Sequence, residues 1–249
     1  FGEDSDFVRV RVRGVFPRVD AESFISFELA TAATKRTPEL NNDPIIIGVD
    51  VGRFGDDPSI LFPRKGRDGV TFQPEVIFKQ DTMYTAARAA QMFLALGAVA
   101  VMVDSGGVGG GVADRLRQLQ IPVFDVDFGS GADNPSVNDG TKYANKRAEI
   151  WGRMREWLKI GCVPERVRGV EVSVVDELTA PTHGLNNAEE IQIESKKSMR
   201  KRQIKSTNIA DALACTFAYD VFVPLPPHMR PKHADVTPDY DPFAPENRV

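Results

Sequence analysis

The segment that most constrains the fold is IIIGV at 45–49, in which every residue except Gly48 is β-branched and which leads directly into Asp50. Such a run is typical of a strand buried on both faces of a sheet. A carboxylate at the end of a buried strand costs free energy unless it is paired or binds a cation. A glycine-containing turn with Asp56 and Asp57 follows at once. The sequence therefore predicts a central strand that delivers a carboxylate to a polar site.

Two other acidic residues stand beside apolar segments in the same way. Asp104 follows the run at 99–103, and Asp211 lies within the apolar segment at 209–214. Magnesium and manganese take oxygen ligands, and carboxylates supply both the ligands and the compensating charge. A single aspartate after a strand is more often a turn or capping residue. Only the joint arrangement makes Asp50, Asp104 and Asp211 candidate catalytic residues and metal ligands.

Composition is that of a globular protein and decides little about partners. Charged residues make up 27% of the chain and hydrophobic residues 42%. The net charge of −4 does not indicate the basic surface typical of nucleic-acid binding, although an acidic metal cluster can hide a local basic patch. No apolar run is long enough to span a bilayer and the first residues do not form a signal peptide, so we expect no membrane contact. Cys162 and Cys215 lack metal-ligand spacing and are expected to be reduced thiols.

The order of expected elements indicates an α/β fold. Three strands at 44–50, 59–62 and 70–79 are joined by short loops, which predicts an antiparallel meander. Helices and strands then alternate as in parallel βαβ units, and Ser206 is expected to cap a last helix that carries Asp211. The remaining expected elements are helix 85–96, strand 99–104, helix 110–119, strand 121–126, helices 142–159 and 168–177, strand 190–194 and the last helix to about 222. The prediction is a mixed central sheet flanked by helices.

The chain is expected to divide into three parts. Residues 1–43 are predicted to be a linker segment, 44–223 a single α/β domain, and 224–249 a proline-rich tail without a packed core. In an open α/β sheet, ligands bind at the carboxyl ends of the strands. We therefore expect Asp50 and Asp104 to converge there, with Asp211 joining them from the last helix.

A meander, βαβ units and a closing helix with an acid match the ribonuclease H-like fold, and four segments carry a more specific resemblance. They are FVRVRVRGVFP at 7–17, GVDVGRFGDD at 48–57, VDSGGVGGGVADRL at 103–116 and ESKKSMRKRQIKSTNIADALACTFA at 194–218. Together they resemble the C-terminal nuclease region of the large terminase subunit of tailed bacteriophages, the motor that packages DNA into the capsid.

The resemblance implies a ribonuclease H-like endonuclease that cleaves double-stranded DNA with two divalent cations, Mg²⁺ or Mn²⁺. Its carboxylates fall on Asp50, Asp104 and Asp211, with Asp56 as a fourth metal ligand. We expect Asp50 to bridge both ions. The chain departs from the family at Asn208, where an aspartate is often found; a neutral amide would support a metal less well.

The resemblance also implies partners. They are an ATPase domain, the portal or procapsid, and the small terminase subunit, all acting in the host cytoplasm. No G-x-x-x-x-G-K-[ST] phosphate-binding loop occurs in these residues, so the ATPase half is expected to be absent.

A basic segment precedes the last helix and is expected to contact the DNA backbone. By default such a run is a solvated face, and only its place next to Asp211 favours DNA binding. The candidate DNA-binding residues are Lys196, Lys197, Arg200, Lys201, Arg202 and Lys205.

Three alternative functions remain open. An ATPase or sugar kinase of the actin-like fold also begins with a strand, an aspartate and a glycine turn, but its second phosphate loop is not evident after Asp104. A resolvase or transposase would share the metal chemistry and differ in substrate. A non-catalytic DNA-binding or motor-docking module is the remaining alternative, for which Asn208 leaves room.

Overall fold

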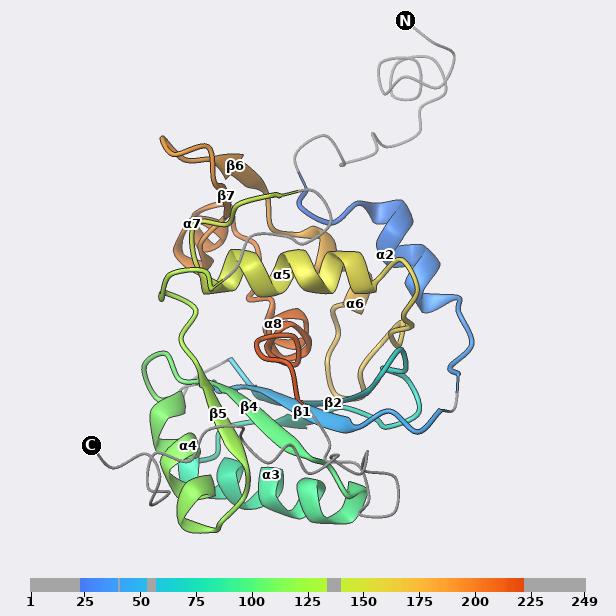
Figure 1. Ribbon diagram of the computed structural model, residues 1–249, viewed down its shortest axis with the longest axis vertical. Helices are drawn as coiled ribbons and strands as arrows, with labels where there is room; N and C mark the ends of the chain where they lie inside the picture. The colour runs from blue at the N-terminus through green and yellow to red at the C-terminus, as the bar shows by residue number, and fades with distance from the viewer. Residues whose placement is uncertain (1–22, 40, 53–56, 134–139, 222–249) are drawn as a thin grey trace, which may run out of the picture.

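In a computed structural model of the chain, residues 23–39, 41–52, 57–133 and 140–221 are described. They form three layers, with a sheet in the middle and helices on both of its faces (Figure 1). The expected segments 7–17 and 224–249 and the residue Asp56 lie outside the described residues.

Five strands of the described chain form the central sheet, in the order β3-β2-β1-β4-β5. The first three strands pair antiparallel, whereas β4 pairs parallel to β1 and β5 pairs parallel to β4. Their bounds are β1 Ile45–Asp50, β2 Ser59–Lys65, β3 Glu75–Ile77, β4 Ala100–Asp104 and β5 Val123–Val126. All six residues of β1 are buried, as expected for the central strand of a sheet covered on both faces. The predicted mixed sheet is confirmed.

The register of the parallel strands places two of the predicted acids side by side. Val49 of β1 pairs with Val103 of β4, so Asp50 and Asp104 end neighbouring strands at the same edge. The glycines after Asp104 form a tight turn into α4 (Gly109–Gln118). A Cβ atom on Gly109 would lie 1.8 Å from the carbonyl oxygen of Asp104, so only glycine permits this close packing.

Helices cover the two faces of the sheet unequally. Helix α3 (Thr82–Leu96) and helix α4 lie on one face, and α5 (Lys146–Trp157), α6 (Val174–Thr179) and α8 (Asn208–Cys215) lie on the other (Figure 1). Every residue of α8 is buried, because this helix lies between β1 and the outer helix α5. A Cβ atom on Gly48 of β1 would lie 1.9 Å from the carbonyl oxygen of Ala212, so glycine lets α8 approach the strand directly.

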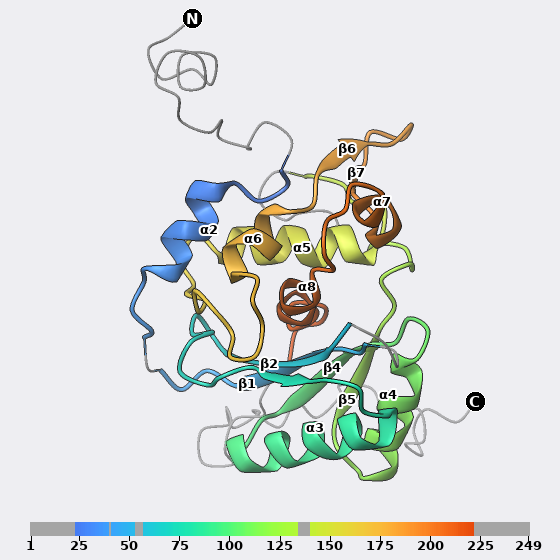
Figure 2. The ribbon, with the colours of Figure 1, turned by 180° about the vertical axis from the view of Figure 1, so that it is seen from behind.

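The expected linker segment contains residues that pack on the domain. Helix α2 (Phe27–Thr34) lies beside α6, and Ile25, Ala30 and Ala33 are buried in the same core as α8 (Figure 2). A small hairpin of β6 (His183–Leu185) and β7 (Ile191–Ile193) leads into α7 (Lys196–Lys201), which carries the basic segment.

The last helix differs from its prediction. It begins at Asn208 and ends at Cys215, and Ser206 is not its N-cap; Thr207 occupies that position without a capping hydrogen bond from its side chain. Instead Glu177 of α6 accepts hydrogen bonds from the backbone N–H groups of Ile209 (2.7 Å) and Ala210 (3.0 Å). The prediction of a Ser206 cap and a helix to 222 was wrong, because the cap comes from another helix.

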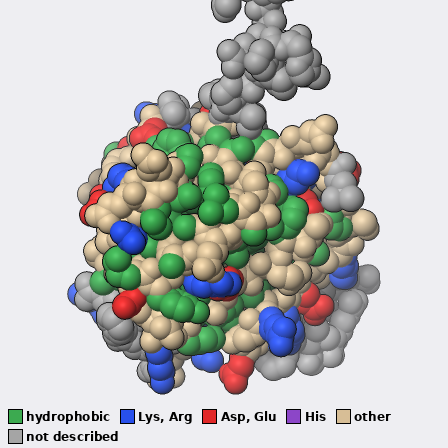
Figure 3. Space-filling model, turned by 90° about the horizontal axis from the view of Figure 1, so that it is seen from below, with side chains coloured by type: hydrophobic (Ala, Val, Ile, Leu, Met, Phe, Trp, Pro, Cys, Tyr) green, Lys and Arg blue, Asp and Glu red, His purple; other side chains and the backbone are tan. Residues whose placement is uncertain are grey.

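The face formed by α3 and α4 has no concentration of one charge. Hydrophobic side chains spread over its middle, and Lys and Arg side chains are scattered singly around them (Figure 3). Among the helices of the described chain, none has the length and apolar character needed to cross a membrane.

Candidate metal centre

Two of the three predicted acids lie at the carboxyl ends of β1 and β4, and the third lies on the helix packed against the sheet. Asp50 ends β1 and is 3% exposed, and Asp211 lies in the first turn of α8 with no exposed surface. Asp104 ends β4 and is half-buried. The arrangement follows from the parallel register and the close packing at Gly48, which bring α8 onto the end of the sheet.

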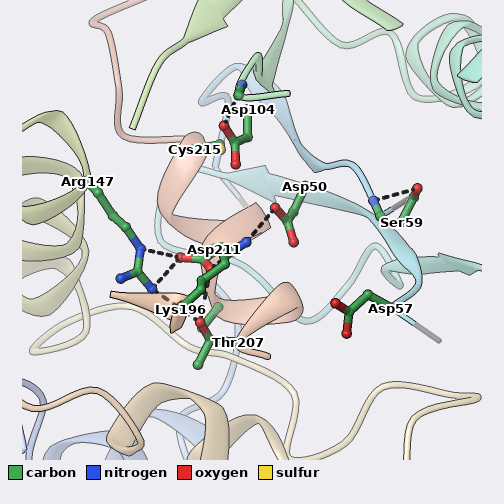
Figure 4. A network of polar contacts seen from close by, with 12 residues as sticks. Asp50, Asp57, Ser59, Asp104, Arg147, Lys196, Thr207, Asp211 and Cys215 are labelled. Carbon is green, nitrogen blue, oxygen red and sulfur yellow. Dashed lines mark hydrogen bonds and ion pairs between the residues drawn. The ribbon is translucent and has the colours of Figure 1, made fainter. Parts of the chain in front are cut away.

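A lysine lies between two of these acids. The Lys196 ammonium is 3.1 Å from Asp50 Oδ1 and 3.2 Å from Asp211 Oδ2 (Figure 4). Burial lowers the pKa of Lys196, but attraction to Asp211 and Asp50 outweighs it, so the net pKa lies above its usual value. The structure therefore has a cationic group between two buried carboxylates.

Three further side chains fix the orientation of Asp211. Arg147 donates to Asp211 Oδ1 from Nε and from a terminal nitrogen, both at 3.2 Å, and the Trp151 indole donates to the same oxygen at 2.8 Å. The Thr207 hydroxyl donates to Oδ2 at 3.0 Å. Burial raises the pKa of Asp211, but attraction to Arg147 and Lys196 and the indole hydrogen bond outweigh burial and lower it. Asp211 is thus held as a carboxylate.

The other two acids are less well neutralised. Burial raises the pKa of Asp50 and repulsion from Asp211 adds to the effect, although Lys196 opposes both. Burial and repulsion from Asp50 raise the pKa of Asp104 to about 7. Like charges held together in this way favour either protonation or a bound cation.

The donor set suits hard divalent cations. Carboxylate oxygens are the ligands that Mg²⁺ and Mn²⁺ take, and two of these three acids have raised pKa values that a cation would relieve. Within the described part of the chain, no group of three or more His, Cys, Asp and Glu side chains has the spacing of a complete metal site. Lys196 supplies positive charge at Asp50 and Asp211, so a cation there competes with its ammonium.

The predicted DNA-binding residues fall into different settings. Lys196 reaches the acids, Arg200 pairs with Asp57 at 3.1 Å, and Arg202 pairs with Glu194. Lys205 lies 3.8 Å from Glu171. The exposed residues Lys197 and Lys201 have no ion pair within the described chain. Contact with DNA stays a prediction for all six.

The sequence patterns did not identify Arg147, Trp151 or Thr207 as site residues. Arg147 lies four positions before Trp151 on the predicted helix, so it shares the apolar face of that helix. A cation on an apolar face needs a buried acidic partner. That pattern is the signal by which the pairing of Arg147 with Asp211 could be inferred.

Comparison with solved structures identifies the fold. The nuclease domain of the large terminase subunit gp2 of bacterial virus Sf6 matches with a TM-score of 0.67 and 19% identity, over 80% of this chain and 100% of that domain. The chain has the fold of a phage large-terminase nuclease domain. This ribonuclease H-like fold was expected from the sequence and is confirmed. At this identity the likeness concerns the fold alone.

Two further matches were solved with metals. A lysine-to-alanine variant of the Sf6 domain with manganese and β-thujaplicinol gives a TM-score of 0.68 and 19% identity, over 80% of this chain and 100% of that one. The large terminase nuclease of thermophilic phage G20c with magnesium gives 0.54 and 13% identity, over 80% and 97%. No protein-family model and no curated protein matches this sequence.

Proposed function

We propose that the chain is a metal-dependent endonuclease that cleaves double-stranded DNA during packaging of a phage genome. The observation that carries this proposal is the convergence of Asp50, Asp104 and Asp211 at the edge of the sheet, around a position that Lys196 supplies with positive charge. The metal-containing structures of nuclease domains with the same fold support it.

The three carboxylates are proposed to hold two divalent cations. Asp50, which ends the central strand β1, would bridge both ions, and Asp104 and Asp211 would each bind mainly one. Asp56 stays a predicted fourth ligand. When bound, two such ions generate a nucleophilic hydroxide and stabilise the attacking and leaving oxygens of the phosphodiester.

The chain's own residues prepare this site. Arg147 and Trp151 occupy Oδ1 of Asp211, which leaves Oδ2 directed toward Lys196 and the proposed cation site. If Asp50 and Asp211 held cations, the Lys196 ammonium would be available to bind a phosphate oxygen. Asp104 must lose its proton to act as a ligand, so cation binding weakens below the pKa of about 7.

The duplex is proposed to lie along α7. Lys197 and Lys201 are exposed on the helix that delivers Lys196 to the acids. Lysines that contact phosphates fix the position of a duplex without reading its sequence. The proposed partners, namely the ATPase domain, the portal or procapsid and the small terminase subunit, and the setting in the infected host rest on the family resemblance.

One observation favours a non-catalytic DNA-binding module instead. Lys196 and Arg147 already compensate much of the acidic charge without a metal. In that case the acids would be structural ion-pair partners, and removing one would weaken folding without removing any activity.

Cleavage of supercoiled plasmid separates the two functions. The chain is incubated with Mn²⁺, Mg²⁺ or EDTA, beside the variants Asp104→Asn and Asp57→Asn; Asp57 is an exposed acid paired with Arg200, outside the cluster. We expect metal-dependent nicking and linearisation by the wild type and by Asp57→Asn, and none by Asp104→Asn. Equal cleavage by all three proteins would contradict the proposal.

A further inference from the structure

A cavity of about 580 Å³ lies next to the acid cluster but is not part of it. It opens between the start of α8, the connection from α7, strand β2 and the loop at 169–172. Its walls include Phe78, Val170, Ile204 and Ile209, and none of the three site acids lines it. The volume and apolar walls are those of a small-ligand site.

The cavity contains a nearly buried amide without a partner. Asn208, the first residue of α8, lines the cavity and is only 7% exposed. Its side chain has no hydrogen-bond partner among the described residues. Because its amide atoms still reach solvent through the cavity, a ligand bound there can take up their unused donors and acceptor.

A second polar group lines the same cavity beside Asn208. Glu177 is 5% exposed, and its Oε2 caps α8 by accepting from the backbone of Ile209 and Ala210. Its Oε1 has no hydrogen-bond partner in the described chain. Burial raises the pKa of Glu177 to about 8, although the two backbone hydrogen bonds oppose the shift. Near neutral pH this carboxyl group therefore carries a proton and can donate it in a hydrogen bond.

The remaining lining adds an aromatic surface and positive charge. The Phe78 ring is 47% exposed at the cavity, which leaves room for another ring to stack on it. Arg200 and Lys205 are exposed lining residues, where they can hold an anionic group outside the apolar walls. Asp57 and Glu171 pair with these two cations and limit the charge that a ligand meets.

We propose that this cavity binds the base of a nucleotide. The base stacks on Phe78, its hydrogen-bonding edge meets the Asn208 amide and the Glu177 carboxyl group, and its phosphate lies by Arg200 and Lys205. Asn208 and Glu177 offer both donors and acceptors, as the edge of a base requires, and every base has a flat face for stacking.

The nucleotide has two possible sources with the same chemistry. It is either a free mononucleotide or a nucleotide of bound DNA whose base has left the duplex stack. Extrusion from a duplex costs a few kcal/mol, and least for an unpaired base. The DNA source rests on the proposed function, whereas binding of a free mononucleotide does not.

The first arm of the test uses free deoxynucleoside monophosphates in EDTA. Saturation-transfer NMR reports which ligand protons contact the protein, and titration gives the Kd. We expect transfer to the base protons of at least one mononucleotide. Phe78→Leu should weaken binding about tenfold, because it removes the stacking surface while keeping an apolar side chain. Asn208→Leu should weaken it similarly.

The second arm uses a short duplex with one unpaired 2-aminopurine. Neighbouring bases quench 2-aminopurine in the stack, so its fluorescence should rise when it leaves the stack for the cavity. Phe78→Leu should abolish this rise. Tyr84→Leu removes an exposed ring on α3 and serves as the matched control. Because Phe78 is half-exposed, its variant reports on the cavity even if Asn208→Leu fails to fold. Both arms are run in EDTA, which keeps the result independent of cleavage.

Each outcome decides the proposal. Base contact that depends on Phe78, in either arm, supports it and identifies the source. The proposal is overturned if the first arm shows no transfer to base protons and the second shows no rise in fluorescence, or if Phe78→Leu leaves binding unchanged. If the wild-type chain binds a mononucleotide but does not cleave plasmid, the proposed nuclease function is contradicted, whereas the assignment of the cavity is not.

Discussion

At the scale of single residues, two cations of different kinds compensate the acids. Arg147 is buried on α5, and its planar guanidinium makes several hydrogen bonds to fixed partners, including the carbonyl of Glu194 at 2.6 Å. The Lys196 side chain is 31% exposed on the short helix α7. A flexible ammonium that remains partly in water leaves its partners more easily than a buried guanidinium. We therefore infer that Lys196 is the exchangeable cation of the site.

Removing the Lys196 charge should favour metal binding. In Lys196→Met the competing ammonium is absent, so we expect Mn²⁺ to bind about tenfold more tightly by calorimetry. The metal-free variant should also melt at a lower temperature, because Asp50 and Asp211 lose a partner. Lys197→Met, which removes an exposed charge on the same helix, is the control. Identical Mn²⁺ affinity in Lys196→Met and the wild type would rule out competition.

Glu177 should make the stability of the fold depend on pH. Its pKa is raised to about 8 in the folded chain from an ordinary value of 4.5, so the folded state holds the proton more tightly than the unfolded state. The free energy of unfolding should therefore fall as the pH rises from about 4.5 to about 8 and then level off. Glu177→Gln keeps an acceptor for the α8 cap and cannot titrate. Its melting temperature should decline less over this range; an equally steep decline would contradict the assignment.

At the scale of elements, α8 is the piece that completes the site. It is short and wholly buried, its cap comes from α6, and its contact with the sheet depends on a glycine in β1. The sequence predicted the helix and its acid, because apolar residues surround Asp211 on both sides. It did not predict the start and end of the helix, because a cap from Glu177 is a tertiary contact without a local pattern.

A side chain added at Gly48, where β1 contacts α8, should destabilise the domain. A Cβ atom on Gly48 would lie 1.9 Å from a backbone oxygen of α8, so Gly48→Ala must displace the helix. Overpacking of this kind costs about 1–3 kcal/mol. Gly184→Ala on β6 is the control, since nothing lies within 4 Å of its added atom. Thermal denaturation of the two variants checks this; equal melting temperatures would contradict the close packing.

At the scale of the whole molecule, the sequence predicted the topology better than the electrostatics. The buried run before Asp50 and the alternation after it indicated a mixed sheet in which Asp50 and Asp104 end neighbouring strands. The ion pairs around the acids were not predicted from the sequence. Lys196, expected to contact DNA, instead contacts two of the acids, and Arg147 comes from a helix in which no site residue was expected. Such pairings depend on how distant elements dock, which no local pattern encodes.

The overall placement of positive charge should appear in the salt dependence of DNA binding. Lys197 and Lys201 are exposed and have no ion pair in the described chain, unlike Arg202, which Glu194 holds. Replacing both lysines with glutamine should weaken duplex binding and reduce the slope of log K against log salt by about 2. Arg202→Gln should change the slope less. An unchanged slope in the double variant would exclude these lysines from the interface.

The most direct test of the central claim is calorimetric titration of Mn²⁺ into the wild type and Asp104→Asn at pH 8, above the pKa of Asp104. Binding needs neither DNA nor an ATPase domain, so it reports on the acid cluster alone. We expect two ions per chain for the wild type and the loss of at least one of them in Asp104→Asn. The same number of ions bound with the same affinity by both proteins would contradict this claim.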